Sequence, residues 1–175
     1  MKLLTVDIGT VNVGWAIASP EALQQPTLIL HGVYRPPANV GRNIGWLLVD
    51  IRSWLTVTAR THAITNIVYC SPIQVFGNNW WTTRKVVSIA GQIEVTGHDL
   101  DILVEEADEP TVRRHFLAPH KVPRKSPEIK AAVMARCAAL GINPDTDDAG
   151  DAVAVADYVL SVKNSPLLRK IAELI

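Results

Sequence analysis

The sequence predicts an α/β domain, because apolar strand segments are combined with segments of helical periodicity along the chain. Residues 3–6 form an apolar, partly β-branched run that is typical of a buried strand. Residues 39–60 place leucine and isoleucine at helical spacing, which predicts a long helix capped by Asn39. Residues 66–71 form another apolar, β-branched run, which indicates a central strand.

The other elements follow from the same two patterns. Further strands are predicted at residues 11–19, 27–34 and 101–105. Further helices are predicted at residues 82–97, 110–116, 127–140, 147–163 and 166–175, with Ser126 as the cap of the helix over 127–140. No repeat or linker divides the chain, so we expect one domain spanning residues 1–175.

The composition restricts the class of protein. Hydrophobic residues make up 48% of the 175 residues, which is enough for a sizeable core. No apolar run reaches the ~18 residues that a membrane span needs, and no signal peptide is recognised at the N-terminus. The two cysteines give neither a disulfide framework nor a metal-binding spacing. We therefore expect a protein of the cytosol or of a comparable reducing compartment, such as an organelle matrix.

The first fifteen residues combine a strand, an acid, a glycine turn and a second strand. Asp7 stands at the end of an apolar strand, where a carboxylate is out of place in a core, and Gly9 follows it. A carboxylate near a glycine, where no side chain blocks the backbone, suits a metal ion that binds a phosphate. The alternative is a hairpin in which Asp7 only caps the turn.

The zero net charge hides strong segregation of charges. Residues 99–109 carry six acids and no Lys or Arg, whereas residues 111–136 carry seven Lys or Arg and one acid. A basic stretch between acidic ones favours a polyanion bound beside a metal site, although a solvated helix face is the alternative. The predicted DNA-backbone contacts are Arg113, Arg114, Lys121, Arg124 and Lys130.

Two further segments carry candidate functional residues. Trp80 and Trp81 lie on a predicted polar and aromatic loop, so they are predicted to stack on DNA bases with Arg84 nearby, or else to form a dimer contact or plug a helix end. Asp148 and Asp151 lie three residues apart in a helix rich in small residues, which would place both acids close to a sheet. Such acids suit Mg²⁺ or Mn²⁺, although acids at a helix start also complement its dipole.

Four segments together resemble the RuvC-like Holliday-junction resolvases of the RNase H-like superfamily, the small phage-type members above all. They are LTVDIGTVNVGWAIA, VYCSPIQVFG, EPTVRRHF and DDAGDAVAVADYVL, and the resemblance extends to about residue 160. It implies a five-stranded mixed sheet of order 3-2-1-4-5 with helices on both faces. It also implies a homodimer that nicks four-way DNA junctions symmetrically during recombination and repair, with two Mg²⁺ or Mn²⁺ ions per active site.

The resemblance also assigns site residues. Asp7 matches the first-strand carboxylate of the family, and Asp148 and Asp151 match the acids of its closing helix. These three would bind the metal ions. Lys125 matches a lysine that the family places close to the scissile phosphate, with Lys121 as the alternative.

One position departs from the family. Cys70 stands where the family carries a catalytic Glu, and a neutral thiol is a poor ligand for Mg²⁺. We therefore expect impaired nicking, unless Glu105 or Glu106 reaches the site instead. Without such a replacement, the chain is either an inactivated variant that still binds junctions or a naturally impaired relative.

Parts of the sequence are compatible with three further functions. A non-catalytic junction-binding protein is favoured by Cys70, and a nuclease for RNA–DNA hybrids is compatible with the same scaffold. The DIGT segment also resembles the first phosphate motif of actin-like ATPases and sugar kinases. Those proteins need a second Gly-rich phosphate loop, and the sequence shows none.

Overall fold

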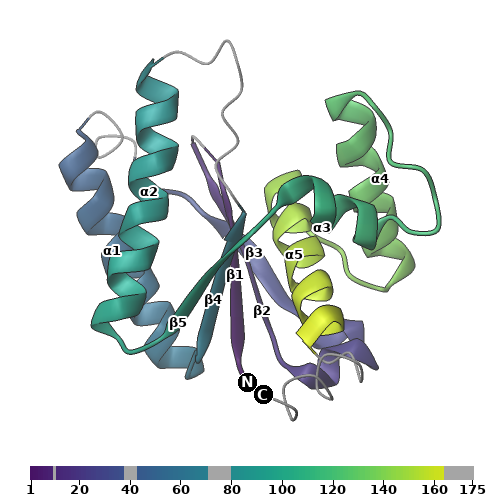
Figure 1. Cartoon of the computed structure of the whole chain (residues 1–175), viewed down its shortest axis with the longest axis horizontal. Helices are drawn as coiled ribbons and strands as arrows, with labels where there is room; N and C mark the ends of the chain where they lie inside the picture. The colour runs from purple at the N-terminus through teal and green to yellow at the C-terminus, as the bar shows by residue number, and fades with distance from the viewer. Residues whose placement is uncertain (10, 38–42, 71–79, 164–175) are drawn as a thin grey trace, which may run out of the picture.

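Five strands form one mixed sheet in the order β3-β2-β1-β4-β5 (Figure 1). The computed structural model describes residues 1–9, 11–37, 43–70 and 80–163. The strands are β1 (Leu3–Ile8), β2 (Val13–Ala18), β3 (Leu30–Tyr34), β4 (Asn66–Cys70) and β5 (Leu103–Ala107). β1 runs antiparallel to β2 and parallel to β4, so the predicted strand order and mixed sheet are confirmed.

Helices cover both faces of the sheet, as predicted. α1 (Ile44–His62) and α2 (Trp80–Asp99) lie on one face, and α5 (Asp147–Lys163) lies on the other (Figure 1). α3 (Glu109–Phe116) and α4 (Ser126–Ala139) lie outside α5. None of the described helices is both long and apolar enough to span a bilayer.

The side chains of β1 alternate between two cores. Leu4 and Val6 are buried against α1 and α2, whereas Leu3 is buried on the side of α5. The hydroxyl of Thr5, on the α5 side, donates a hydrogen bond of 2.7 Å to the carbonyl oxygen of Ala152. Asp7 lies two residues further along, so the same alternation turns it toward α5.

α5 packs against the sheet through small residues. Ala149, Ala152 and Ala156 are fully buried. At the start of the helix, the backbone of Asp148 lies directly on Gly14 of β2, where an added Cβ would stand 2.0 Å from the Asp148 carbonyl oxygen. A glycine is therefore required at position 14 for the helix to come this close.

Several predicted boundaries were wrong. β5 begins at Leu103 rather than at residue 101, because Asp101 adopts a left-handed turn with φ 56°. Glu105 and Glu106 consequently lie inside the strand. Lys125, not Ser126, occupies the cap position of α4. The predicted loop tryptophans, Trp80 and Trp81, form the first turn of α2 instead.

The other differences concern the ends of elements. Asn43 caps α1, because its side chain accepts hydrogen bonds from the backbone at residues 45 and 46; the predicted cap, Asn39, lies outside the described residues. The segment predicted as one strand over 27–34 starts with a 3₁₀ turn, η2 (Pro26–Leu28), which follows another, η1 (Pro20–Leu23). The predicted helix over 166–175 also lies outside the described residues.

Substituting Gly14→Ala should lower the free energy of unfolding by about 1–3 kcal/mol, because the new methyl group collides with the backbone of α5. Urea denaturation followed by circular dichroism would measure the change. Gly45→Ala is the matched control, since Gly45 is exposed in the first turn of α1 and meets only the Asn43 side chain. We expect the control to stay within about 1 kcal/mol of the parent; equal losses in both variants would contradict the contact.

Candidate functional site

Acidic side chains from different parts of the chain gather at one end of the sheet. Asp7 lies opposite Gly14 in the β1–β2 register, and Gly14 touches the backbone of Asp148. The pKa of Asp7 is raised well above its ordinary value, first by burial and then by the negative charges of Asp151 and Asp148. The fold thus brings a β1 carboxylate into electrostatic contact with the first turns of α5.

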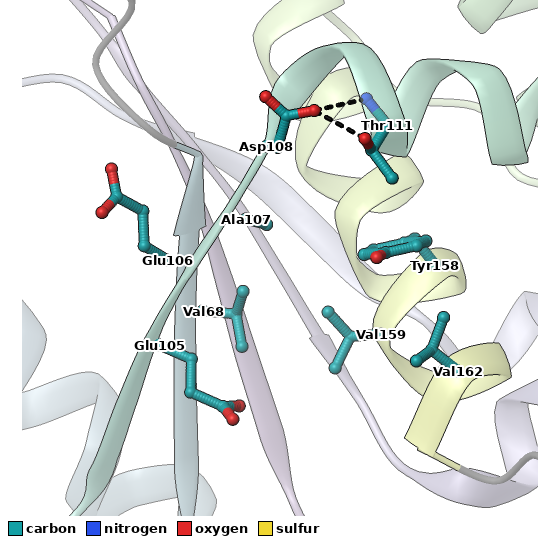
Figure 2. A pocket seen from close by; sticks show the side chains of 9 residues that line it. All are labelled: Val68, Glu105, Glu106, Ala107, Asp108, Thr111, Tyr158, Val159 and Val162. Carbon is teal, nitrogen blue, oxygen red and sulfur yellow. Dashed lines mark hydrogen bonds between the residues drawn. The ribbon is translucent and has the colours of Figure 1, made fainter. Parts of the chain in front are cut away.

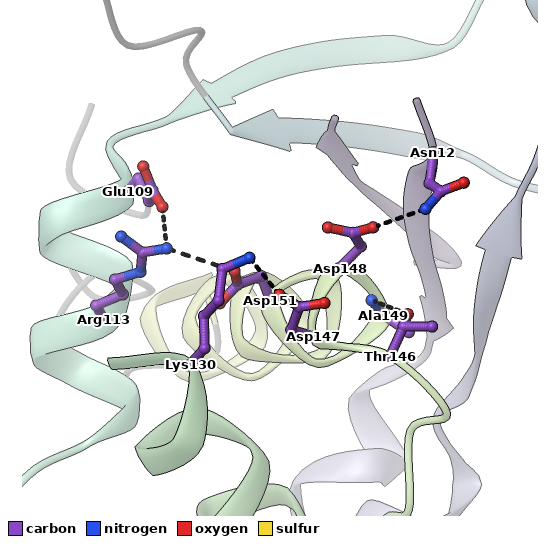
Figure 3. A network of polar contacts seen from close by, with 9 residues as sticks. All are labelled: Asn12, Glu109, Arg113, Lys130, Thr146, Asp147, Asp148, Ala149 and Asp151. Atoms are coloured by element: carbon purple, nitrogen blue, oxygen red, sulfur yellow. Dashed lines mark hydrogen bonds and ion pairs between the residues drawn. The ribbon is translucent and has the colours of Figure 1, made fainter. Parts of the chain in front are cut away.

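Asp151 lies between the sheet and α3. Burial raises the pKa of Asp151 to about 6, although the nearby Arg113 guanidinium lowers it. Arg113 Nη2 lies 3.4 Å from Asp151 Oδ2, and the same guanidinium forms an ion pair with Glu109 one helical turn earlier (Figure 3). Arg113 therefore links the acids of two helices.

The start of α5 is fixed by polar contacts on both sides. Asn12 Nδ2 donates to Asp148 Oδ2 over 3.4 Å, and Asp147 forms an ion pair with Lys130 of α4 (Figure 3). The Thr146 hydroxyl accepts a hydrogen bond of 3.2 Å from the backbone N–H of Ala149. These contacts hold the first turn of α5, and with it Asp147 and Asp148, in a defined orientation.

Cys70 lies among these acids. It is the last residue of β4, one step beyond the Val6–Tyr69 pair, and therefore stands beside Asp7. Burial, followed by the charges of Asp7, Glu109 and Asp151, raises the pKa of the Cys70 thiol far above its ordinary value. The thiol is consequently neutral. A carboxylate at this position would lie beside Asp7, Glu109 and Asp151.

The donor chemistry of this group fits a hard divalent cation. Asp7, Asp148 and Asp151 offer only oxygen as a donor atom. Burial and then the repulsion of neighbouring acids raise the pKa of Asp7, and a bound cation would relieve that repulsion. Within the described ranges, however, no three His, Cys, Asp or Glu side chains stand close enough to hold a metal ion as they are. The acids share one end of the sheet without forming a closed ligand set, and the metal site stays a prediction.

Glu105 and Glu106 occupy other places. Glu105 and Glu106 both line a cavity of about 380 Å³ together with Tyr158 and Val159 (Figure 2). Glu106 sits beside Tyr69, whose pKa is raised by burial, by its hydrogen bond to Glu94 and then by the charge of Glu106.

Glu109 is an acid of this group that the sequence patterns did not single out. Burial is the largest cause of the raised pKa values of Asp7, Cys70 and Asp151, and the negative charge of Glu109 raises all three further. The sequence holds a signal for it, because Glu109 and Arg113 stand four residues apart at a helix start, which is the spacing of an ion pair.

The predicted basic residues do not act as one group. Lys130 lies near the acids, and its pKa is raised by the hydrogen bond to Asp147 and by the charges of Asp147, Asp148 and Asp151. Lys125 is 80% exposed and lies 3.7 Å from Glu128. Lys121 lines a separate cavity with His120 and Arg136. Arg114 and Arg124 are exposed, whereas Arg113 is paired within the acids.

The two tryptophans lie on the surface of the first turn of α2. Trp80 is 75% exposed and Trp81 is 41% exposed. The guanidinium carbon of Arg84 stands 5.8 Å from the centre of the Trp81 ring, which is within the range of a cation–π contact. Residues 71–79, where the sequence predicts a loop, lie outside the described residues.

Solved structures of Holliday-junction resolvases have a similar fold. RuvC of Thermus thermophilus in complex with a Holliday junction substrate aligns over 94% of this chain and 96% of its own, with a TM-score of 0.67 and 15% identity. A second T. thermophilus RuvC structure aligns over 93% of this chain and 96% of its own, with a TM-score of 0.65 and 15% identity. The fold is that of the RuvC-like resolvases.

The yeast mitochondrial Holliday junction resolvase Ydc2 has the RuvC-like fold too. It covers 90% of this chain and 77% of its own, with a TM-score of 0.61 and 11% identity. No protein-family model and no curated protein matched the chain. The similarity to these resolvases is therefore one of fold, at low sequence identity.

Asp151→Asn should stabilise the metal-free protein at pH 7 by about 1–3 kcal/mol. A carboxyl with a raised pKa binds more protons when folded than when unfolded, so its contribution to stability falls as pH rises from about 4 to about 6. The gain should therefore vanish near pH 4. Urea unfolding in EDTA across this pH range would measure it.

The matched control for this prediction is Asp145→Asn. Asp145 is exposed and lies two residues before α5. We expect no comparable gain from that variant. An equal pH-dependent gain in both variants would show that general charge repulsion, rather than the burial of Asp151, is responsible.

Proposed function

We propose that this chain is a divalent-metal-dependent endonuclease that cuts four-way DNA junctions. The observation that supports this most is the meeting of Asp7, Asp148 and Asp151 at one end of a sheet of RuvC-like fold. RuvC, which has this fold, has been seen in complex with a Holliday junction substrate. Branched DNA is accordingly the substrate class that we assign.

Mg²⁺ or Mn²⁺ would be held by Asp7 together with Asp148 and Asp151, and we expect two ions per site. When bound, such ions supply an activated water and stabilise the leaving oxygen of the phosphodiester. Lys130, which forms an ion pair with Asp147 beside the acids, would contact the phosphate that is cut. Lys125 stays the candidate taken from the family resemblance.

DNA binding would use the exposed cations around α3 and α4. Arg114, Lys121, Arg124 and Lys125 are all exposed there. Trp80 and Trp81, with Arg84 beside the second ring, offer flat surfaces on which unpaired bases at a junction could stack. Binding through such phosphate contacts weakens steeply as salt rises.

Cys70→Glu should raise the rate of junction nicking by about tenfold or more, because it restores a carboxylate beside Asp7. The measurement is cleavage of labelled four-way junction DNA with Mg²⁺ or Mn²⁺, beside the parent chain. Asp7→Asn is the control and should abolish nicking in either background. Binding to junction and to linear duplex is measured in parallel for each variant.

The outcomes separate the candidate functions. If Cys70→Glu binds junctions yet never nicks them, the enzyme assignment fails and a junction-binding protein is left. If neither chain prefers junctions to linear duplex, both junction functions fail.

We also propose that the chain forms a homodimer through α2. Val87, Gly91 and Val95 recur every fourth residue on this helix; the two valines are each 52% exposed. A Cβ added at Gly91 would meet nothing within 4 Å, so this stretch of the helix is open to a partner. A second copy of α2 could approach it closely there.

Val95→Arg should shift the chain from dimer to monomer, because it places a charge in this apolar stretch. Light scattering coupled to size-exclusion chromatography would report the mass. Leu28→Arg is the control, since Leu28 is 48% exposed but lies on η2, away from α2. A dimer that survives Val95→Arg would contradict this interface.

A further inference from the structure

We propose that Glu109 supplies the carboxylate that Cys70 does not, and that Arg113 takes the place of the metal ion's charge in the metal-free protein. The inference rests on the proposed metal-dependent function. It assigns the missing ligand to the first turn of α3, which follows the end of β5, the strand that pairs with β4.

The first step is the position of Glu109. β5 ends at Ala107, which pairs with Cys70 at the end of β4. Asp108 caps α3, because its Oδ2 accepts hydrogen bonds from the backbone N–H of Thr111 at 3.0 Å and from its hydroxyl at 2.6 Å. The cap fixes the first turn of α3, and hence Glu109, at the edge of the sheet where Cys70 lies.

The second step is electrostatic. A carboxylate at position 70 would act on Asp7 and on Asp151. The charge of Glu109 acts on both, and on the Cys70 thiol as well.

The third step concerns Arg113. Its guanidinium pairs with Glu109 on its own helix and reaches Asp151 of α5 at 3.4 Å, so it bridges two of the proposed ligands (Figure 3). The Nε of Arg113 is buried and has no hydrogen-bond partner among the residues that the structure describes. A buried donor left without a partner is costly, so this bridge is not a fully satisfied ion-pair network.

A divalent cation and Arg113 therefore compete for the same carboxylates. When a cation takes Glu109 and Asp151, the guanidinium loses its partners and becomes available to a DNA phosphate. Arg113 would then contact the DNA backbone only in the metal-loaded protein. Metal binding would thus control whether the positive charge of Arg113 is available to DNA.

The test is a Mn²⁺ titration of the full chain without DNA, in which electron paramagnetic resonance counts the free ion. Glu109→Gln should weaken Mn²⁺ binding by about tenfold or more, whereas Glu106→Gln, the matched control on β5, should bind as the parent does. Arg113→Gln should bind Mn²⁺ more tightly, because the competing cation is gone. In the Cys70→Glu background, Glu109→Gln should cost much less than it does in the parent.

The results distinguish this inference from the function on which it rests. If Glu109→Gln binds like the parent while Asp7→Asn does not bind, the inference is overturned and the metal centre stands. If Asp7→Asn also binds like the parent, the proposed metal centre itself fails. Circular dichroism confirms folding for each variant; should Glu109→Gln not fold, unchanged or weaker binding by Arg113→Gln would still overturn the inference.

Discussion

The site depends on how α5 packs against the sheet. The hydroxyl of Thr5 in β1 donates to the carbonyl of Ala152, and the backbone of Asp148 rests on Gly14 of β2. These two contacts fix the helix along and across the strands. Side chains alternate along a strand, so Asp7 lies on the same face of β1 as Thr5. Asp7 therefore faces the acids of α5 and not the core under α1 and α2.

The electrostatic cost of this meeting explains the surrounding charges. Buried carboxylates that repel one another destabilise a fold unless cations or protons compensate them. Here the pKa values of Asp7 and Asp151 are raised, and two cations stand beside the group: Arg113 from α3 and Lys130 from α4. Both helices follow the sheet in sequence and pack outside α5. The fold thus delivers positive charge to the acids from the side that also exposes Arg114, Lys121, Arg124 and Lys125.

β1, β2 and β4 could be predicted from the sequence because they are short, mostly apolar runs, whereas the strand order followed from the family resemblance. The proximity of Asp7 to Asp148 and Asp151 could also be predicted from the sequence. An acid at the end of an apolar strand and a helix rich in small residues are both unusual features. The position of Glu109 could not be predicted in this way, because it depends on where β5 ends. The left-handed turn at Asp101 shifts β5, and with it this end, by two residues. The tryptophans were misplaced for a related reason: α2 begins two residues earlier than its apolar periodicity.

The burial of both cysteines has a practical side. Cys70 is 6% exposed and Cys137 is fully buried, and burial is the first cause that raises the pKa of each thiol. Thiolate, not thiol, reacts with maleimides and oxidants, so both sulfurs are chemically quiet in the folded chain. A cysteine introduced on the surface would thus carry a fluorophore almost alone, and the native protein offers a clean background for single-molecule work on its motions.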